Sequence, residues 1–569
     1  MNSSNVEWWR GGVIYQIYPR SFLDTNQDGI GDLAGITQKL DYVAELGVDA
    51  IWLSPFFTSP MKDFGYDISD YCNVDPMFGD LNDFKTLLQK AQGLGLKIMI
   101  DQVLNHTSDQ HPWFEESRQN HDNPKSDWYV WADANPDGTP PTNWMSVFGG
   151  SAWQWDSRRK QYYLHNFLAS QPDLNFHNPE VVDAVLETVK FWLELGVDGF
   201  RLDTANFYYH DAELRNNPPR EEVAEGGIGV RLDNPYGFQL HLYDKSRPEN
   251  IRFLTRFRAL LDQYPNTTSV GEVGCDFSLK TMAAYTQGTD KLHMCYSFDL
   301  LTADSSMNHV RKTMESIEAG LGDGWPCWSI SNHDVERVAS RWGNGVAHAE
   351  QAKIFMAMLL CLRGSVCLYQ GEELGLAEAE LAYEDLVDPY GITFWPEFKG
   401  RDGCRTPMPW DASEQAGFSQ HKPWLPVVDS HLQRSVASQT HDELSVLSAY
   451  RDFLALRKQR PELVSGDICF FYSSPSVLLF ERSLAGVHTL IALNTGDQPA
   501  KVDLSALLLP GAPVSAKQDI VLPVALQSGE FQGGVVSLPP YSVYLGELAT
   551  GLAEFKLPQS TTAKQEKTL

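Results

Sequence analysis

Eight short β-rich apolar runs alternate with longer helical patterns along this chain, and the alternation restricts the fold more than any other feature. The runs lie at residues 13–17, 50–53, 97–102, 199–203, 269–273, 294–299, 327–331 and 365–369. Stretches between them, such as 83–94 and 182–195, repeat apolar residues at the spacing of an amphipathic helix. We predict an α/β fold, a parallel (β/α)8 barrel with its functional groups at the C-terminal strand ends. An open doubly wound sheet, the alternative, would not gather such distant strands at one site.

Two interruptions divide the chain further. The barrel is predicted to comprise residues 1–104 and 179–465, because the segment 105–178, rich in Trp, Pro, Asp, Asn and Gly, is too long for a simple loop. We expect that segment to form an inserted excursion domain, after the third strand and over the barrel mouth. From Gly466 the short alternating runs predict a C-terminal antiparallel β-sandwich domain, residues 466–549. A polar tail, residues 550–569, is expected to fray.

Charge and composition restrict the partners and the compartment. The formal net charge of −29 argues against nucleic acid and anionic membranes as partners. No apolar run approaches the roughly 20 residues of a membrane helix, and the first residues lack a signal-peptide pattern. The eight cysteines show no metal-ligand spacing, so we interpret them as free buried thiols. We therefore expect a cytoplasmic protein, a monomer or small homo-oligomer.

Five short motifs carry carboxylates, and four of them lie at or just beyond predicted strand ends. They are DQVLNH at 101–106, QPDLN at 171–175, GFRLD at 199–203, GEV at 271–273 and SNHD at 331–334. Glycosyl transfer with retention needs one ionised carboxylate and one protonated carboxyl, about 5–5.5 Å apart across the scissile bond. The joint occurrence of these motifs, rather than any one of them, predicts a retaining glycosidase.

The roles follow from each carboxylate's neighbours. Asp203 follows Arg201 on the same strand face, where the guanidinium would keep it ionised as a nucleophile. Glu272 lies between a glycine and an apolar valine, a setting that would raise the pKa of a general acid. Asp334 would bind sugar hydroxyls more tightly as the ring flattens in the transition state. Taken singly, each has an ordinary alternative: a surface ion pair, a solvated glutamate or a capped turn.

In this order the motifs resemble glycoside hydrolase family 13, the α-amylase family, and specifically its oligo-1,6-glucosidase and α-glucosidase branch, of which QPDLN is typical. The resemblance implies Asp203 as nucleophile, Glu272 as acid/base and Asp334 as transition-state stabiliser. It also implies a set of residues that contact the first sugar: His106, Arg201 and His333 beside Asp101, with Phe167, Gln171 and Arg337.

Two more segments extend the resemblance. The stretch FGYD at 64–67 is similar to one whose tyrosine stacks on the non-reducing glucose and whose aspartate binds its hydroxyls, here Tyr66 and Asp67. The stretch GRDGCRTPMPW at 400–410 is similar to a loop whose arginine pairs with that aspartate. We assign this arginine to Arg401, with Arg405 as the competitor. A pair of this kind would close the pocket behind one sugar and make the enzyme exo-acting.

The resemblance also bears on substrate preference. In this branch, valine directly after the nucleophile is associated with α-1,6 bonds, whereas here the position is Thr204, which favours α-1,4 bonds and short substrates such as maltose or sucrose. The small Gly274 and Cys275 after Glu272 would permit transglucosylation. An oligo-1,6-glucosidase, a glucosyltransferase or a sucrose isomerase remain alternatives, because they share the catalytic residues. A non-catalytic scaffold of the same fold is remote, because the triad is complete.

The loop DTNQDGIGD at 24–32 alternates oxygen donors: Asp24, Asn26, Asp28, the Ile30 carbonyl and Asp32. Hard oxygen donors on a glycine-bent loop suit a calcium or magnesium ion, and similar loops in the branch hold a metal away from catalysis. The loop is not an EF-hand, because its twelfth position is Gly35. We expect a structural ion and no organic cofactor; the alternative is an unoccupied Asx-turn loop.

Overall fold

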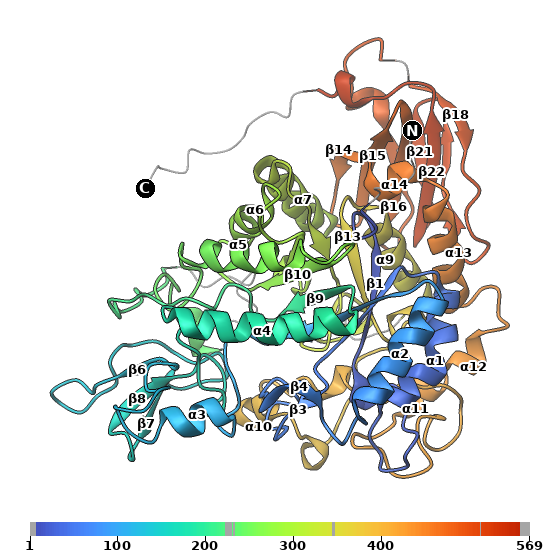
Figure 1. The fold of residues 1–569 in the computed structure, drawn as a ribbon. Helices are drawn as coiled ribbons and strands as arrows, with labels where there is room; N and C mark the ends of the chain where they lie inside the picture. Colours follow the sequence, from blue (N-terminus) through green and yellow to red (C-terminus); the bar gives the residue numbers. More distant parts are fainter. Residues whose placement is uncertain (1–6, 222–229, 231–233, 344–347, 513, 558–569) are drawn as a thin grey trace.

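Eight parallel strands form a barrel at the centre of the computed structural model, which describes residues 7–557 except 222–229, 231–233, 344–347 and 513 (Figure 1). The strands are β1 Val13–Ile17, β2 Ala50–Leu53, β5 Lys97–Gln102, β9 Gly199–Leu202, β10 Thr268–Val273, β11 Met294–Ser297, β12 Cys327–Trp328 and β13 Ser365–Tyr369. They pair in the order β11-β10-β9-β5-β2-β1-β13-β12, and a parallel bridge between Cys295 and Pro326 joins the two ends. The predicted barrel is confirmed, although β12 is shorter than predicted.

Helices cover the outside of the barrel between successive strands. They are α1 Leu33–Leu46, α2 Leu81–Gly93, α4 Pro179–Leu195, α5 Asn250–Leu261, α6 Ser278–Thr286, α7 Met307–Leu321, α9 Ala349–Cys361 and α13 Val446–Lys458. Local sequence sets their ends: Asp80 and Asp83 form a capping box at the start of α2, and Gly196 ends α4 at a φ of 101°. Shorter helices follow β12 and β13: α8 Val338–Arg341, α10 Pro389–Phe394, α11 Asp429–Leu432, α12 Val436–Gln439 and α14 Pro461–Ser465.

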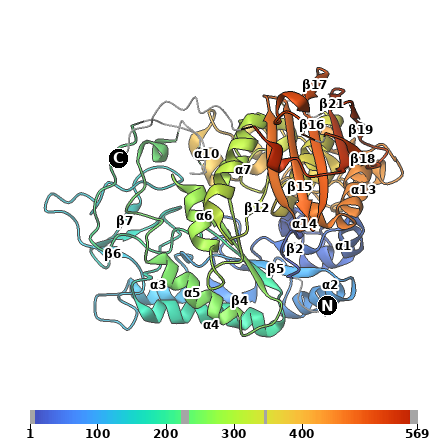
Figure 2. The ribbon, with the colours of Figure 1, turned by 90° about the horizontal axis from the view of Figure 1, so that it is seen from above.

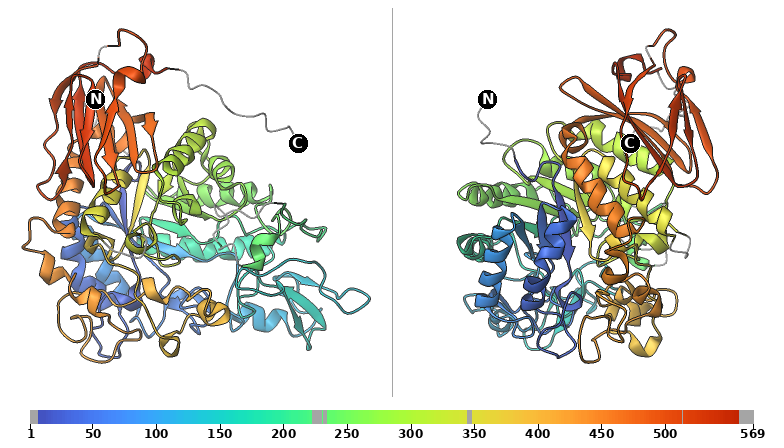
Figure 3. Two further views of the ribbon diagram at one scale, coloured as in Figure 1. Left: turned by 180° about the vertical axis from the view of Figure 1, so that it is seen from behind. Right: turned by 90° about the vertical axis from the view of Figure 1, so that its right-hand side faces the viewer.

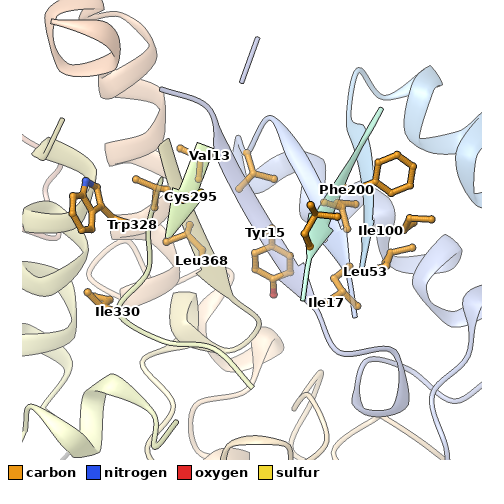
Figure 4. Packing of buried hydrophobic residues seen from close by; sticks show 14 of the residues in the cluster. Val13, Tyr15, Ile17, Leu53, Ile100, Phe200, Cys295, Trp328, Ile330 and Leu368 are labelled. Atoms are coloured by element: carbon orange, nitrogen blue, oxygen red, sulfur yellow. The ribbon is translucent and has the colours of Figure 1, made fainter. Parts of the chain in front are cut away.

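The side chains of each barrel strand alternate between two cores. Val13, Tyr15, Leu53 and Ile100 belong to the large core between strands and helices, part of which Figure 4 shows. The intervening residues, among them Trp52, Met99, Val270 and Tyr296, fill the barrel interior. Because side chains alternate along a strand, every second residue of β5, β9, β10 and β11 points into the barrel. This alternation directs the motif residues inward.

The segment after β5 forms the expected excursion. It contains α3 Pro112–Ser117 and a small antiparallel sheet in which β6 Trp131–Ala132 and β7 Trp153–Asp156 flank β8 Gln161–Leu164. A short hairpin of β3 Phe57–Thr58 and β4 Asp70–Val74 precedes it. Figures 1 and 2 show the excursion and the C-terminal domain on opposite sides of the barrel.

The C-terminal domain consists of two β-sheets packed face to face. The larger contains β14 Asp467–Ser473, β15 Val477–Leu484, β16 Val487–Asn494, β18 Ala516–Asp519, β19 Gln527–Ser528 and β22 Ser542–Leu548. The smaller pairs β17 Ala500–Asp503, β21 Val535–Leu538 and β20 Glu530–Gln532. Leu479, Leu490 and Val536 lie in the core between them, while Phe480 and Ile491 belong to the barrel core. Figure 3 shows this domain from two further sides.

Three further predictions, on the cysteines, on membrane helices and on the C-terminal tail, can be compared with the structure. All eight cysteines are free, and six are buried, whereas Cys72 and Cys469 are half-buried. Helices within the described residues all lack the length and apolar character needed to cross a membrane. The prediction that the tail from residue 550 frays is wrong as far as residue 557, because Leu552 is fully buried and Lys556 forms a backbone β-bridge with Leu508. The rest of the tail lies outside the described residues.

Candidate active site

A cavity opens at the C-terminal ends of the barrel strands, and the three predicted catalytic carboxylates line it. Asp203 directly follows β9, Glu272 lies in β10 and Asp334 follows β12. The other lining residues are Asp63, Tyr66, His106, Val147, Phe148, Phe167, Gln171, Thr204, Phe207, Gly274, Phe298, His333, Tyr390 and Arg401. Residues from distant parts of the chain therefore meet in one pocket, as the barrel prediction requires.

Arg201 organises the carboxylates from within the barrel. Its Nη1 lies 2.6 Å from Asp203 Oδ1 and 2.9 Å from Asp101 Oδ1, and its Nη2 lies 2.6 Å from Glu272 Oε1. One guanidinium thus serves three buried carboxyl groups, and ionising all three would leave uncompensated charge in a water-poor site. Burial raises the pKa of Asp203 and of Glu272 to about 7, against the opposing effect of Arg201. The arrangement favours one shared proton near neutral pH, as acid/base chemistry needs.

Asp334 has the opposite electrostatic environment. Burial would raise the pKa of its carboxyl, but the imidazole of His333 and the guanidiniums of Arg401 and Arg405 together lower it. Arg405 Nη2 donates to Asp334 Oδ1 at 3.0 Å, and Arg401 Nη1 does so at 3.3 Å. Asp334 therefore stays ionised and can attract positive charge that develops on a sugar ring.

His333 is held as a neutral donor. Burial lowers its pKa well below the ordinary value, and Gln16 donates its amide N–H to His333 Nδ1 at 2.8 Å. The proton then lies on Nε2, which is 2.5 Å from Tyr66 OH and 3.2 Å from Asp334 Oδ2. The Tyr66 ring stacks on this imidazole, with 5.2 Å between centroids, and its hydroxyl donates to Asp101 Oδ2.

One wall of the cavity contains a buried ion cluster around Arg401. Arg401 Nη2 donates to Asp63 Oδ1 and to Asp388 Oδ1, both at 2.8 Å, and Arg401 Nε donates to Asp388 Oδ2. Gln171 Nε2 donates to Asp63 Oδ2 at 3.0 Å, and His106 lies 3.2 Å from the same amide nitrogen. Phe167 packs against His106 at 5.3 Å. The predicted arginine is therefore in place, with Arg405 beside it on Asp334.

The prediction that Arg401 pairs with Asp67 is wrong. Asp67 does not line the cavity; its carboxylate accepts hydrogen bonds from the Lys62 and Asp63 backbone N–H groups and from Ser59 Oγ. Those donors fix the turn before Tyr66 and leave Asp63 to meet Arg401. The sequence did contain this candidate, because Asp63 directly precedes the FGYD stretch and lies three positions before Tyr66.

Three other predicted contacts lie behind the cavity wall. Asp101 and Arg201 have no exposed surface and do not line the cavity, so they act through Tyr66, Asp203 and Glu272. Arg337 was predicted to bind substrate, but its guanidinium donates to the Gln370 and Cys404 carbonyls. Because backbone carbonyls take its donors, Arg337 joins two loops and does not reach the pocket.

Sequence reasoning missed the aromatic wall. Phe148 of the excursion stacks on Tyr390 of α10 at 5.0 Å, and the Arg401 guanidinium lies 5.0 Å from the Phe148 ring. Phe207 packs against Phe167 at 5.4 Å, and Phe298 lies directly after β11. These residues come from separate segments without a shared motif, so their meeting depends on tertiary structure.

Two residues that follow the reactive carboxyls Asp203 and Glu272, namely Thr204 and Gly274, also line the cavity. Thr204 lines it at a φ of 42°, and its backbone N–H donates to Glu272 Oε2 at 3.2 Å. Gly274 also lines it, but Cys275 is buried beside Thr281, with 3.3 Å between Sγ and Oγ1. Of the two small residues singled out in the sequence, only Gly274 widens the pocket.

The loop at 24–32 satisfies its oxygen atoms internally. Asp24 accepts from the Gln27 and Gly29 N–H groups, Asn26 from Asp28, Asp28 from Ile30, and Asp32 from Thr25 and Gly35 at the start of α1. Across the described ranges, no group of three His, Cys, Asp or Glu side chains is arranged to hold a metal ion. These contacts are those of an Asx-turn loop. Asp24 Oδ2 and both Asp32 oxygens already accept two hydrogen bonds each, whereas the side-chain oxygens of Asn26 and Asp28 accept one each and keep a lone pair for a cation.

The revised pairing predicts different effects for two aspartates. Asp63→Asn should raise KM for short α-glucosides about 10-fold or more, because a hydrogen bond to a charged group contributes about 1.5–3 kcal/mol. Asp67→Asn should leave KM within about 2-fold and instead lower stability by about 1–3 kcal/mol, because its donors lose an acceptor. Steady-state kinetics and urea unfolding of both variants measure this. A larger KM effect for Asp67→Asn would restore the original pairing.

Comparison with known proteins agrees with this geometry. The protein-family model for the α-amylase catalytic domain matches residues 16–466 of this chain. A probable α-glucosidase of Rhizobium meliloti (strain 1021) is 57% identical over 501 residues, covering 88% of this chain and 91% of that protein. An oligo-1,6-glucosidase of Heyndrickxia coagulans is 38% identical over 538 residues, covering 88% and 94%.

Among solved structures, the crystal structure of an α-glucosyl transfer enzyme, XgtA, is 56% identical in sequence. It superposes with a TM-score of 0.92, covering 95% of this chain and 100% of that one. The family match spans most of the barrel, and both sequence relatives are named as glucosidases. The chain belongs to the α-amylase family of glycoside hydrolases, in its α-glucosidase branch.

Proposed function

We propose that this enzyme is an exo-acting, retaining α-glucosidase that releases single glucose units from short α-glucosides. The observation that carries the proposal is the buried ion cluster in the cavity wall. There Arg401 pairs with Asp63 and Asp388. We place the terminal glucose against this cluster, which would stop the substrate from extending beyond one sugar unit. These charged groups and the Gln171 amide beside them match the hydroxyls of a terminal glucose, whereas an endo-acting enzyme needs a cleft open at both ends.

The reaction then follows from the positions of two carboxyl groups. Glu272 donates its proton to the glycosidic oxygen while Asp203 attacks the anomeric carbon and expels the leaving group, giving a β-glucosyl ester. Glu272, now ionised, takes a proton from water, and the resulting hydroxide displaces Asp203 with net retention. Asp334 stabilises the cationic ring between these states.

The shared guanidinium supports retention. Asp203 and Glu272 contact the two terminal nitrogens of Arg201, each at 2.6 Å. Two carboxylates held side by side in this way favour the spacing of about 5–5.5 Å of retaining enzymes over the roughly 6.5–9.5 Å of inverting ones.

Proton NMR of the purified enzyme with maltose, isomaltose and sucrose tests the proposal. We expect α-glucose as the first product from maltose or sucrose, with isomaltose consumed slowly. Initial release of β-glucose, or release of maltose units from long chains, would contradict it. New disaccharide signals would instead support the second candidate, transglucosylation or isomerisation. That candidate is favoured by Gly274 in the wall beside Glu272 and by the named activity of the α-glucosyl transfer enzyme.

Thr204 is proposed to set the preference for α-1,4 over α-1,6 bonds. Its side chain lines the cavity beside both reactive carboxyls, and its Oγ1 is buried without a hydrogen-bond partner among the described atoms. Such a hydroxyl can bond the second sugar, and a valine methyl group cannot. Thr204→Val should therefore shift the kcat/KM ratio of isomaltose to maltose upwards about 10-fold. A Thr204→Ser control should keep the wild-type ratio, and an unchanged ratio in Thr204→Val would remove this role.

We also propose a structural calcium or magnesium ion at loop 24–32, supported by the alternation of oxygen donors there. The ion would hold the loop at the start of α1. A ligand at about 100 times its Kd stabilises the folded state by about 2.7 kcal/mol, so EDTA should lower Tm by several degrees and added cation should restore it. Asp28→Ala, which changes an exposed donor, should abolish the difference. A metal-free preparation with unchanged Tm would disprove the ion.

We also propose where the protein is located in the cell and how it assembles. The free thiols, including the Cys327 and Cys367 sulfur atoms 3.5 Å apart without a bond, support a reducing, cytoplasmic setting. We propose a monomer or small homo-oligomer that binds neither nucleic acid nor membranes, supported by the acidic net charge. Light scattering and cell fractionation measure both.

A further inference from the structure

Tyr296 has no part in the roles described so far, yet its hydroxyl lies between the acid/base and the central arginine. It belongs to β11, points into the barrel and is almost fully buried. Its hydroxyl donates to Glu272 Oε1 at 2.8 Å and accepts from Arg201 Nη2 at 2.9 Å and Nε at 3.2 Å. Every hydrogen-bonding position of the phenol is thus used within the reactive cluster.

These contacts make the two oxygens of Glu272 different. Oε1 faces two donors, the Tyr296 hydroxyl and the Arg201 guanidinium at 2.6 Å. Among the residues that the structure describes, the donor to Oε2 is the Thr204 N–H alone, at 3.2 Å. A carboxyl oxygen that accepts two strong donors has no place for a proton, so the acidic proton resides on Oε2. A freely rotating carboxyl group would spend part of its time with the proton on the wrong oxygen.

We propose that Tyr296 is a positioning residue that holds Oε1 of Glu272 and thereby presents the protonated Oε2 to the glycosidic oxygen. This inference rests on the proposed function, because it assumes Glu272 as the acid/base. Tyr296 does not line the cavity, so it would act through Glu272 and not by touching substrate.

The effect on proton affinity follows from the charges around Glu272. The groups near Glu272 come from four barrel strands and the loops that follow them. They are Arg201 of β9 and Asp203 directly after it, Asp101 of β5, Tyr296 of β11, and His333 and Asp334 after β12, with Arg401 and Arg405 beyond Asp334. Tyr296 carries no formal charge and contacts Glu272 directly, so its hydroxyl can be removed without changing the charge of the cluster. A hydroxyl that donates to a carboxylate stabilises its ionised form, so removing the hydroxyl makes ionisation harder and raises the pKa of Glu272.

Tyr296→Phe therefore has two expected signatures. The acid must be protonated in the first step, so the basic limb of the kcat/KM profile should move up by about one pH unit. Loss of positioning should lower kcat/KM for maltose about 10- to 100-fold, because maltose needs protonation of its leaving group. For α-glucosyl fluoride, whose leaving group needs little protonation, kcat/KM should fall less than about 3-fold.

Tyr450→Phe is the matched control. Tyr450 of α13 is also buried and donates to a buried carboxylate, Glu372 Oε1 at 3.1 Å, but it lies away from the cavity. This variant should show wild-type pH limbs and equal ratios for both substrates. An unmoved basic limb in Tyr296→Phe, or equal losses on maltose and the fluoride, would overturn the proposal.

A second variant covers the case in which Tyr296→Phe folds poorly. Fluorotyrosine placed at position 296 keeps the shape and donates more strongly, so the basic limb should move to lower pH; movement upwards or no movement would contradict the inference. Failure of the proposed function would be visible in the wild type itself, through release of β-glucose. The comparison of leaving groups uses whichever α-glucoside the wild type consumes.

Discussion

Replacing Asp203 with asparagine should lower kcat for maltose by about four to six orders of magnitude, because removing a covalent nucleophile eliminates the pathway rather than weakening one contact. Folding should survive. Arg201 keeps Asp101 and Glu272 as partners, and burial already makes the charge of Asp203 costly, as its raised pKa shows. Single-turnover kinetics and mass spectrometry with α-glucosyl fluoride should detect no glucosyl ester in the variant.

Azide supplies the control for this assignment. In Asp203→Gly the lost carboxyl leaves room for a small anion on the face of the sugar that Asp203 would attack. Azide should restore turnover of α-glucosyl fluoride and yield β-glucosyl azide, the inverted product. Retained maltose hydrolysis in Asp203→Asn, or an α-azide from Asp203→Gly, would show that another group is the nucleophile.

The barrel and its reactive centre were predictable because both depend on local periodicity. Alternation along β9 puts Arg201 and Asp203 on one face, and the same rule puts Glu272 of β10 inside the barrel beside them. Parallel strands of one barrel end at the same rim, so strand-end motifs had to converge. The sequence was therefore enough to predict that the carboxyls of the proposed triad meet at one rim, and the family resemblance suggested their roles.

Contacts made by loops were less predictable. Asp63 and Asp67 are both buried aspartates of one turn, and only the direction of backbone N–H groups decides which remains for Arg401. The failure with Arg337 has the same origin, because nearby backbone carbonyls accept hydrogen bonds from both terminal nitrogens of its guanidinium. Tyr296 was part of a correctly predicted strand, yet a tyrosine inside a barrel normally indicates packing, and its partners Arg201 and Glu272 come from two other strands.

Glu272→Gln separates the two steps of the reaction. The amide cannot protonate a leaving group, so kcat/KM for maltose should fall about 10²- to 10⁴-fold, whereas α-glucosyl fluoride should still react with Asp203. Without a base to activate water, the glucosyl ester should then accumulate and appear by mass spectrometry as a protein carrying one glucosyl unit. The basic limb of the wild-type maltose profile, set by a carboxyl whose pKa burial raises to about 7, should be absent from the residual maltose activity of this variant.

Stereochemistry gives the decisive comparison between the two carboxyls. In Glu272→Ala, azide should enter from the side that water uses and displace Asp203 from the ester, yielding α-glucosyl azide. Opposite azide anomers from Glu272→Ala and Asp203→Gly would fix one residue on each face of the sugar. The same anomer from both variants would mean that Arg201 holds two carboxyls of equivalent function, and the assignment of acid and nucleophile would fail. Because the two variants remove neighbouring partners of one guanidinium, a general loss of charge balance cannot produce opposite anomers, and only their separate roles can.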